Sequence, residues 1–261
     1  MSLIGEERKE IILNILNFAG KVRTNELVEK LQVSSETIRR YLEELEGEQR
    51  LKRVYGGAIK INYDREEPSH LKREVLYAEE KQLIGQAASL LVQNNDVIVI
   101  DDGTTTQQII PYLIHKQNVT ILTGSFPALS LLMDYQNRGL LTGELYFIGG
   151  KVQPKHLRTS GALSVNMIEN FHIDKAFLSI DGISMRQGIT SYDVEKALVV
   201  KTYIDNAKTS IVMTDQSKIG LGTFYKICDL KEIDIIISGV CAPKDWKQEL
   251  EDRDINWIVA Q

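Results

Sequence analysis

A short loop in the middle of the chain combines residues that suit phosphate binding. It reads Asp-Asp-Gly-Thr-Thr-Thr over residues 101–106 and directly follows an apolar run. Gly103 would let the main chain approach a ligand, and the hydroxyl groups of Thr104 and Thr105 can donate hydrogen bonds. A helix that begins near Gln107 would add the partial positive charge of its N-terminus. The loop therefore predicts a phosphate site, although a strand, a Gly-Thr turn and a helix cap are also common as plain architecture.

Two further loops place polar side chains after apolar runs. Lys218, in Asp-Gln-Ser-Lys, could reach an anion, and Asp181, in Ile-Asp-Gly, could accept hydrogen bonds from sugar hydroxyl groups. Each has an ordinary alternative, namely a solvated surface lysine and a routine Asp-Gly turn. Three polar strand ends in one sheet favour a polar ligand. The candidate ligand-binding residues are Asp102, Gly103, Thr104, Thr105, Asp181 and Lys218.

The elements that must position these loops alternate between short apolar runs and segments of helical periodicity. Helical periodicity is clear over residues 81–92 and 193–207. Buried strands that alternate with helices predict a Rossmann-like α/β domain, in which helices cover both faces of a largely parallel sheet and ligands bind at the carboxyl ends of the strands. The expected strands lie at residues 97–100, 119–122, 145–148, 176–180, 210–213 and 233–237.

The first sixty residues have the pattern of a small helical domain. A helix is expected over residues 7–18, and Thr24 and Ser34 are suited to cap a second and a third helix. In the third helix Ile38 and Leu42 lie one turn apart and point toward the core. The spacing of these short helices is typical of a helix-turn-helix.

The outer face of the third helix suits DNA. Short polar side chains at its N-terminus and a pair of arginines one turn later can meet base edges and flanking phosphates. The run at residues 51–59, Leu-Lys-Arg-Val-Tyr-Gly-Gly-Ala-Ile, is typical of a two-stranded wing whose basic residues would meet the DNA backbone. The alternative is an ordinary small domain with solvated charges. The predicted DNA-binding residues are Ser35, Thr37, Arg39, Arg40, Lys52 and Arg53.

Composition narrows the class of protein. With 261 residues and 43% apolar composition, the chain can bury one small and one medium core. The net charge of -5 divides into +1 over residues 1–60 and -6 over the remainder, and residues 50–60 carry four basic side chains and no carboxylate. The first residues lack the apolar core of a signal peptide, and no apolar run approaches the ~18 residues that span a bilayer. Only two cysteines occur and they lack metal-ligand spacing, which indicates a reducing compartment and no structural zinc. We expect a cytoplasmic protein without metal or cofactor.

We expect two domains joined by a linker. The segment from Asn62 to Tyr77 is charged, interrupted by proline and poor in apolar periodicity. The predicted arrangement is a winged helix-turn-helix domain over residues 1–57, a linker over 58–75 and an effector-binding α/β domain over 76–261.

The chain resembles the DeoR family of bacterial sugar-metabolism regulators along nearly its whole length. In the predicted DNA-binding domain, here termed the head, the resemblance rests on two stretches. They are Ser-Ser-Glu-Thr-Ile-Arg-Arg-Tyr-Leu from Ser34 and Leu-Lys-Arg-Val-Tyr-Gly-Gly-Ala from Leu51. In the predicted effector-binding α/β domain, here termed the body, the resemblance rests on the three polar loops together with Gly149, Gly150 and Lys201. The resemblance implies operator DNA as a partner and a phosphorylated sugar as the effector.

Several positions depart from related patterns. Tyr41 stands where the family usually has Asp, so we expect it to pack beside the core and to alter local packing or the preferred DNA site. Gly124 stands where Asn is common in the family. The resemblance also implies a body similar in fold to ribose-5-phosphate isomerase. That enzyme has its catalytic base eighteen residues before the loop lysine, where this chain has Val200, which cannot abstract a proton. Ser184 likewise replaces an isomerase carboxylate.

The sequence therefore predicts a sequence-specific transcriptional regulator with no catalytic residue. We expect a repressor of a sugar-utilisation operon, relieved by a phosphorylated sugar or polyol, which binds double-stranded operator DNA as a homodimer or higher homo-oligomer and does not act at a membrane. One alternative is a sugar-phosphate isomerase or deaminase with an accessory head, which Val200 and Ser184 disfavour. Another is an interaction module without nucleic acid, which rests on the near-neutral head.

Overall fold

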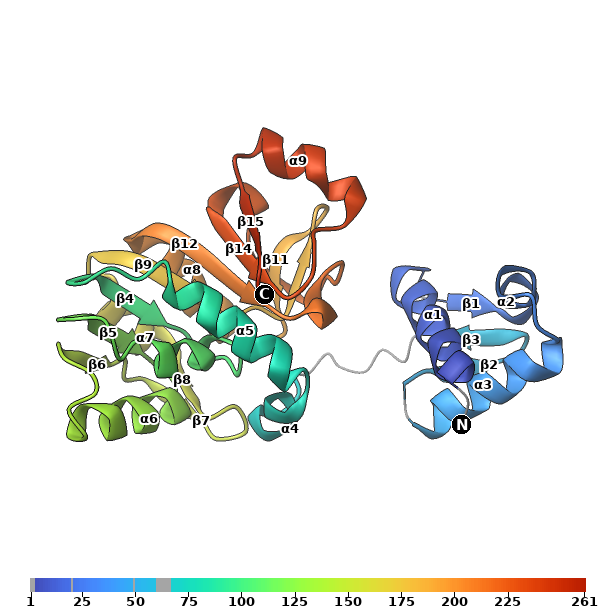
Figure 1. The fold of residues 1–261 in the computed structure, drawn as a ribbon, viewed down its shortest axis with the longest axis horizontal. Helices are drawn as coiled ribbons and strands as arrows, with labels where there is room; N and C mark the ends of the chain where they lie inside the picture. The colour runs from blue at the N-terminus through green and yellow to red at the C-terminus, as the bar shows by residue number, and fades with distance from the viewer. Residues whose placement is uncertain (1–2, 20, 49, 60–66) are drawn as a thin grey trace. The chain divides into compact units, whose positions relative to one another are not determined.

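A computed structural model describes residues 3–19, 21–48, 50–59 and 67–261 and divides the chain into two compact units, Met1–Arg65 and Glu66–Gln261 (Figure 1). Within the described ranges, no helix is both long and apolar enough to cross a membrane.

The N-terminal unit pairs helices with a small antiparallel sheet in the order β1-β3-β2. Ser34 caps α3 as expected, because its Oγ accepts from the N–H of Thr37 at 3.2 Å. The cap expected at Thr24 is wrong: α2 begins at that residue and Arg23 is its N-cap, while the N–H of Thr24 donates to the carbonyl of Gly56 at 2.9 Å. The elements are α1 (Leu3–Ala19), β1 (Lys21–Arg23), α2 (Thr24–Leu31), α3 (Ser35–Gly47), β2 (Lys52–Val54) and β3 (Gly57–Ile59).

One apolar core holds this unit together. Ile38 and Leu42 of α3 are buried, as their spacing predicts, and Tyr41 is 6% exposed and belongs to the same core. The guanidinium of Arg40 lies 5.5 Å from the centre of the Tyr41 ring. The expectation that this tyrosine packs beside the core is therefore confirmed.

The predicted wing is present as the antiparallel pair β2 and β3. Gly56 supplies the turn between them with a φ of +79°, a conformation that favours glycine. The pairing of β1 with β3 was not expected from the sequence, because a three-residue strand is too short to show periodicity.

The C-terminal unit is built on a seven-stranded sheet in the order β15-β14-β12-β9-β4-β5-β6, and all of its pairings are parallel. This confirms the predicted Rossmann-like class. Its strands are β4 (Val97–Ile100), β5 (Thr120–Thr123), β6 (Leu145–Phe147), β9 (Ile173–Leu178), β12 (Ala207–Thr214), β14 (Ile235–Ser238) and β15 (Asn256–Val259).

Helices cover both faces of this sheet (Figure 1). Side chains alternate along β4, so Ile98 and Ile100 join one apolar core and Val99 joins another. The first core includes residues of α5, η1 and α6, and the second includes residues of α7 and α8. The helices are α4 (His70–Val75), α5 (Ala78–Ser89), η1 (Thr106–Tyr112), α6 (Phe126–Asn137), α7 (Ala162–Ile168), α8 (Val194–Asn206), η2 (Gln216–Lys218), η3 (Leu230–Glu232), η4 (Lys244–Trp246) and α9 (Lys247–Asp252).

Smaller elements flank the main sheet. They form an antiparallel sheet in the order β10-β11-β13 and a hairpin of β7 with β8. The helix expected near Gln107 is the 3₁₀ segment η1, which contains Pro111 and has no side-chain cap. Pro111 lies near the C-terminal end of η1, so it removes an N–H there and not at the N-terminus beside residues 101–106. The short strands are β7 (Lys151–Gln153), β8 (Arg158–Ser160), β10 (Gly182–Ser184), β11 (Gly188–Ser191) and β13 (Tyr225–Cys228).

The linker predicted over residues 58–75 is wrong at both ends. The strand β3 extends to Ile59, and α4 spans His70–Val75. Glu67 and Arg73 are buried in the body at 3% and 7% exposure, so residues 67–75 belong to that unit. Residues 60–66, the rest of the predicted linker, lie outside the described ranges.

Candidate functional site

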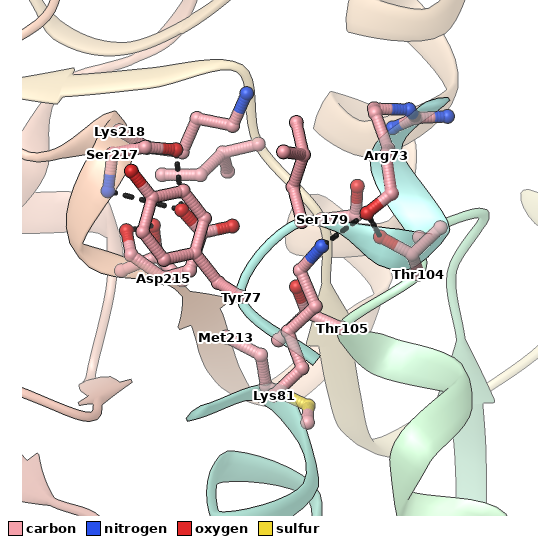
Figure 2. Close-up of a pocket in the computed structure, with 14 residues that line it drawn as sticks. Arg73, Tyr77, Lys81, Thr104, Thr105, Ser179, Met213, Asp215, Ser217 and Lys218 are labelled. Atoms are coloured by element: carbon pink, nitrogen blue, oxygen red, sulfur yellow. Dashed lines mark hydrogen bonds between the residues drawn. The ribbon is translucent and has the colours of Figure 1, made fainter. Parts of the chain in front are cut away.

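A pocket lies where β4, β9 and β12 end. These strands are neighbours in the sheet and run parallel, so the loops that follow them meet at one edge. Figure 2 shows their polar side chains facing the same space. The pocket is lined by Arg73, Leu76, Tyr77, Lys81, Gly103, Thr104, Thr105, Ser179, Ile180, Met213, Thr214, Asp215, Ser217 and Lys218.

Four of the six predicted ligand-binding residues line this pocket, namely Gly103, Thr104, Thr105 and Lys218. A Cβ at Gly103 would lie 2.6 Å from the Cβ of Ser179, so the glycine is needed for packing against that residue. Lys218 is half-buried and forms no ion pair with a residue that the structure describes. Its ammonium group can therefore meet an anion.

The other two predicted residues do not line the pocket. Asp102 is 6% exposed, and its Oδ2 accepts from Arg158 at 2.9 Å. Asp181 is 1% exposed; its Oδ1 accepts from Lys196 Nζ at 3.0 Å and its Oδ2 from the hydroxyl of Ser191 at 2.9 Å. In this arrangement the carboxylate of Asp181 is already occupied and cannot reach a sugar in the pocket.

The sequence missed Lys81 as a pocket residue. Its side chain is 3% exposed, and Nζ donates to the carbonyl oxygen of Arg73 at 2.5 Å. Burial lowers the pKa of the Lys81 ammonium, although Asp215 partly opposes this effect. A lysine at the start of an expected helix is normally predicted to be exposed to solvent. Only the contact of Lys81 with Arg73 in the preceding segment shows that its side chain is buried.

A buried ionic cluster centred on Glu67 adjoins the pocket through Arg73, which belongs to both. The carboxylate oxygens of Glu67 lie 2.7 Å from Arg158, 2.8 Å from Arg73 and 3.6 Å from Lys196. Burial alone would raise the pKa of Glu67, but Lys196, Arg73 and Arg158 outweigh it and lower the pKa to about 2. The cluster ties the segment before α4 to β8 and α8, which lie far away in the sequence.

Asp101 directly follows β4 and is buried. Burial and the neighbouring carboxylate of Asp102 raise the pKa of Asp101 to about 7. Its Oδ2 accepts from the N–H of Ser179 at 2.9 Å and so joins the loop after β4 to the loop after β9. This carboxyl group positions the wall of the pocket.

The pocket offers cations and hydroxyl groups to a ligand. Lys81 and Lys218 supply ammonium groups, and Thr104 and Thr105 supply hydroxyl groups. The lining carboxylate, Asp215, already accepts from the N–H of Ser217 at 3.0 Å through its Oδ1. Ammonium and hydroxyl donors together suit an anionic, oxygen-rich ligand. In the described ranges, no group of three or more His, Cys, Asp or Glu residues could hold a metal ion.

The predicted recognition helix is α3. Ser35, Arg39 and Arg40 are exposed on it, opposite the core residues of the same helix. Thr37 is half-buried, and its Oγ1 lies within hydrogen-bond distance of Ser34 Oγ at 2.9 Å, which engages this hydroxyl in the cap. The exposed side chains of Ser35 and Arg39 can meet a ligand on this face, whereas Arg40 Nε also lies 3.8 Å from Glu44 Oε1 of the same helix.

The wing presents further polar groups. Lys52 and Arg53 are both exposed, and Arg53 lies 3.5 Å from Glu43 of α3. Tyr55, in the turn, is fully exposed and was not among the predicted residues. A phosphate near the wing would compete with Glu43 for the guanidinium of Arg53.

Comparison with protein families gives two matches. Residues 8–63 match the family model described as the DeoR-like helix-turn-helix domain, and residues 77–239 match the DeoR C terminal sensor domain. One match falls in each unit of the structure. Residues of α3 and the wing fall in the first, and the pocket residues from Tyr77 onward fall in the second.

Several known proteins are similar to this chain. The HTH-type transcriptional repressor GlcR of Bacillus subtilis (strain 168) is 33% identical over 89% of this chain and 88% of its own length. The lactose phosphotransferase system repressor of Streptococcus mutans is 31% identical over 94% of this chain and 96% of its own length. Among solved structures, ribose 5-phosphate isomerase A from Methanocaldococcus jannaschii aligns over 54% of each chain, with 19% identity and a TM-score of 0.39.

Proposed function

We propose that this chain, which belongs to the DeoR family of helix-turn-helix transcriptional regulators, represses a sugar-utilisation operon and is released from its operator by a phosphorylated sugar. The pocket is the observation that carries the proposal. Lys81, Lys218 and the hydroxyl groups of Thr104 and Thr105 offer donors to a phosphate at the carboxyl ends of three neighbouring strands. Charge-assisted hydrogen bonds from such donors are the strong ones in proteins.

The remaining lining suits the sugar. The carboxylate of Asp215 and the hydroxyl groups of Ser179 and Ser217 can bond to sugar hydroxyl groups, and the ring of Tyr77 offers an apolar face. Specificity among sugars would come from these residues, because the phosphate donors recognise only the common group.

The body binds its effector and releases it unchanged. Val200, at the position that the isomerase resemblance assigns to the catalytic base, is fully buried in α8. Asp181 is held by Lys196, so it does not act as a base in the pocket. A sensor without turnover reports the concentration of its ligand, which suits a regulator that works in the cytoplasm beside its operator.

Regulated binding to the operator requires two copies of the DNA-binding head. A homodimer would place two α3 helices in successive major grooves, at half-sites one helical turn or a multiple apart. Effector binding would favour an arrangement of the heads that no longer matches this spacing. A preference of about 1 to 3 kcal/mol between the two arrangements is enough for regulation.

Thermal unfolding of the full chain tests the sensor. At a concentration of a hundred times its dissociation constant, a phosphorylated sugar should stabilise the body by about 2.7 kcal/mol, which corresponds to a rise in Tm of roughly 5 °C or more. Lys218→Ala should remove most of that rise. The control is Lys226→Ala, because Lys226 is exposed, pairs with Asp229 and lies outside the pocket. A panel of phosphorylated sugars that leaves Tm unchanged, or a Lys218→Ala protein that responds fully, would show the sensor assignment to be wrong.

A further inference from the structure

The segment Glu67–Tyr77, here termed the strap, contributes to the pocket and also lies next to the boundary between the two units in the chain. It contains α4, and its last residues line the pocket through Arg73, Leu76 and Tyr77. In the chain it also follows almost directly on the boundary between the two units, which falls between Arg65 and Glu66. A change in the strap is therefore the shortest covalent route from the pocket to the DNA-binding unit.

Lys81 holds the main chain of the strap, and the hydroxyl group of Thr104 adds a long, weak contact to the same oxygen. Lys81 Nζ donates to the carbonyl oxygen of Arg73 at 2.5 Å, and Thr104 Oγ1 donates to the same oxygen at 3.5 Å. Figure 2 shows both side chains converging on this oxygen. Within the described ranges, that carbonyl is the one hydrogen-bond partner of the buried Lys81 ammonium.

The same two groups are donors that an anion in the pocket requires. A carbonyl oxygen carries only a partial negative charge, whereas a phosphate group carries up to two full charges on three accepting oxygens. An ammonium group bonds more strongly to an ionised acceptor than to a neutral carbonyl. The carbonyl of Arg73 and a phosphate group therefore compete for Lys81 and Thr104.

The two halves of the strap are held differently. Glu67, at its start, is fixed by Arg158 and Lys196 in the ionic cluster. The end of the strap has an exposed apolar face, because Val75 is 76% exposed and Leu76 is 52% exposed. Tyr77, where the strap meets α5, has a φ of +56°, which is strained for a residue other than glycine. The guanidinium of Arg73 also belongs to the cluster, 2.8 Å from Glu67. The main chain from the Arg73 carbonyl to Tyr77 is thus the part that can leave its place while Glu67 and the Arg73 side chain stay bound.

We propose that Lys81 and Thr104 are shared donors, which hold the Arg73 carbonyl in the arrangement seen here and turn to the phosphate group of the effector when it binds, so that residues 73–77 leave the pocket wall. This inference rests on the proposed function, because it takes the phosphate site as given. It makes Lys81 a ligand of the phosphate group and the strap the element through which the pocket acts on the segment that leads to the head.

Hydrogen–deuterium exchange of the full chain tests this switch, with inorganic phosphate as the probe and chloride at the same ionic strength as the reference. Bound phosphate should protect the amides of residues 103–107 and speed exchange in residues 73–77 at least about threefold. Protection of 103–107 with slowed or unchanged exchange in 73–77 would overturn the switch alone. Absence of protection at 103–107 would overturn both the switch and the phosphate site of the proposed function.

Two variants separate the switch from a general loss of structure. Lys81→Met keeps the apolar stem and removes the ammonium group, so phosphate affinity should fall about tenfold and residues 73–77 should exchange fast without phosphate. Thr104→Val should act in the same direction and more weakly. The control is Lys201→Met, which removes a half-buried lysine of α8 that pairs with Glu232 at 2.8 Å outside the pocket. Unchanged phosphate affinity in both Lys81→Met and Thr104→Val would overturn the inference.

Discussion

Replacing Glu67 by Gln removes the carboxylate that pairs with Arg73 at 2.8 Å at the centre of the buried ionic cluster. Arg158 and Lys196 keep Asp102 and Asp181 as partners, so the uncompensated charge is that of Arg73. All of these side chains are 7% exposed or less. Breaking a buried ion pair by removing one partner costs about 3 to 5 kcal/mol, because the remaining charge stays buried without compensation. We therefore expect Glu67→Gln to destabilise the body strongly.

The pKa of Glu67 gives a second value for the stability that its ionised carboxylate provides. The pKa of Glu67 falls from its ordinary value of 4.5 to about 2 in the folded protein. At about 1.4 kcal/mol per pKa unit, this corresponds to about 3 kcal/mol of stability at neutral pH. Since the folded-state pKa is the lower one, this stability is complete above about pH 4.5 and is lost as the pH falls toward 2.

The assay is urea unfolding followed by tryptophan fluorescence. Both tryptophans, Trp246 and Trp257, lie in the C-terminal unit, so the signal reports on the body alone. At pH 7, Glu67→Gln should lower the free energy of unfolding by about 3 kcal/mol with an unchanged dependence on urea. The control Asp205→Asn removes an exposed partner of Lys201 and should cost no more than about 1 kcal/mol. A loss below about 1 kcal/mol for Glu67→Gln would refute the view that the cluster anchors the start of the strap.

Three further predictions concern the head and the buried carboxylates. Arg39→Ala should abolish specific operator binding, whereas Lys52→Ala should weaken binding to all DNA and reduce its salt dependence by about one charge. Fluorescence anisotropy over a salt series measures both effects, and equal effects of the two variants on specific and on general DNA binding would contradict this division. Because the folded-state pKa of Asp101 is raised to about 7, its contribution to stability falls as the pH rises from about 4 to 7; Asp101→Asn should flatten that fall in urea titrations at several pH values. Asp181→Asn should cost the body about 3 kcal/mol by leaving the buried Lys196 without its 3.0 Å partner, and a stable variant that has merely lost effector affinity would restore a direct role for Asp181 in the pocket.

Elements whose signals are local could be predicted from the sequence. Ser34 caps α3 because a cap depends on residues three positions apart, and Ile38 faces the core because helical periodicity fixes its side. The parallel sheet followed from apolar runs that alternate with helices. Four ligand-binding candidates line the pocket because the ends of neighbouring parallel strands must meet at one edge of the sheet.

Features that depend on distant partners could not be predicted. The charged segment around Glu67 resembled a linker, since nothing near it shows that Arg158, 91 positions later, supplies its counter-charge. Asp181 looked free for the same reason, because Lys196 is its neighbour only in the folded chain. Lys81 is buried by a contact with the carbonyl of Arg73, and main-chain carbonyl groups leave no signature in a sequence.

Release of DNA by a phosphorylated sugar is the measurement that tests the proposed function most directly. The full chain is bound to labelled DNA from upstream of its own operon, and fluorescence anisotropy is followed as phosphorylated sugars are added one at a time. The proposed function predicts that one of them dissociates the wild-type protein, that its unphosphorylated sugar does not, and that Lys218→Ala stays bound at the same concentration. Release by the unphosphorylated sugar, or equal release of wild type and Lys218→Ala, would contradict it.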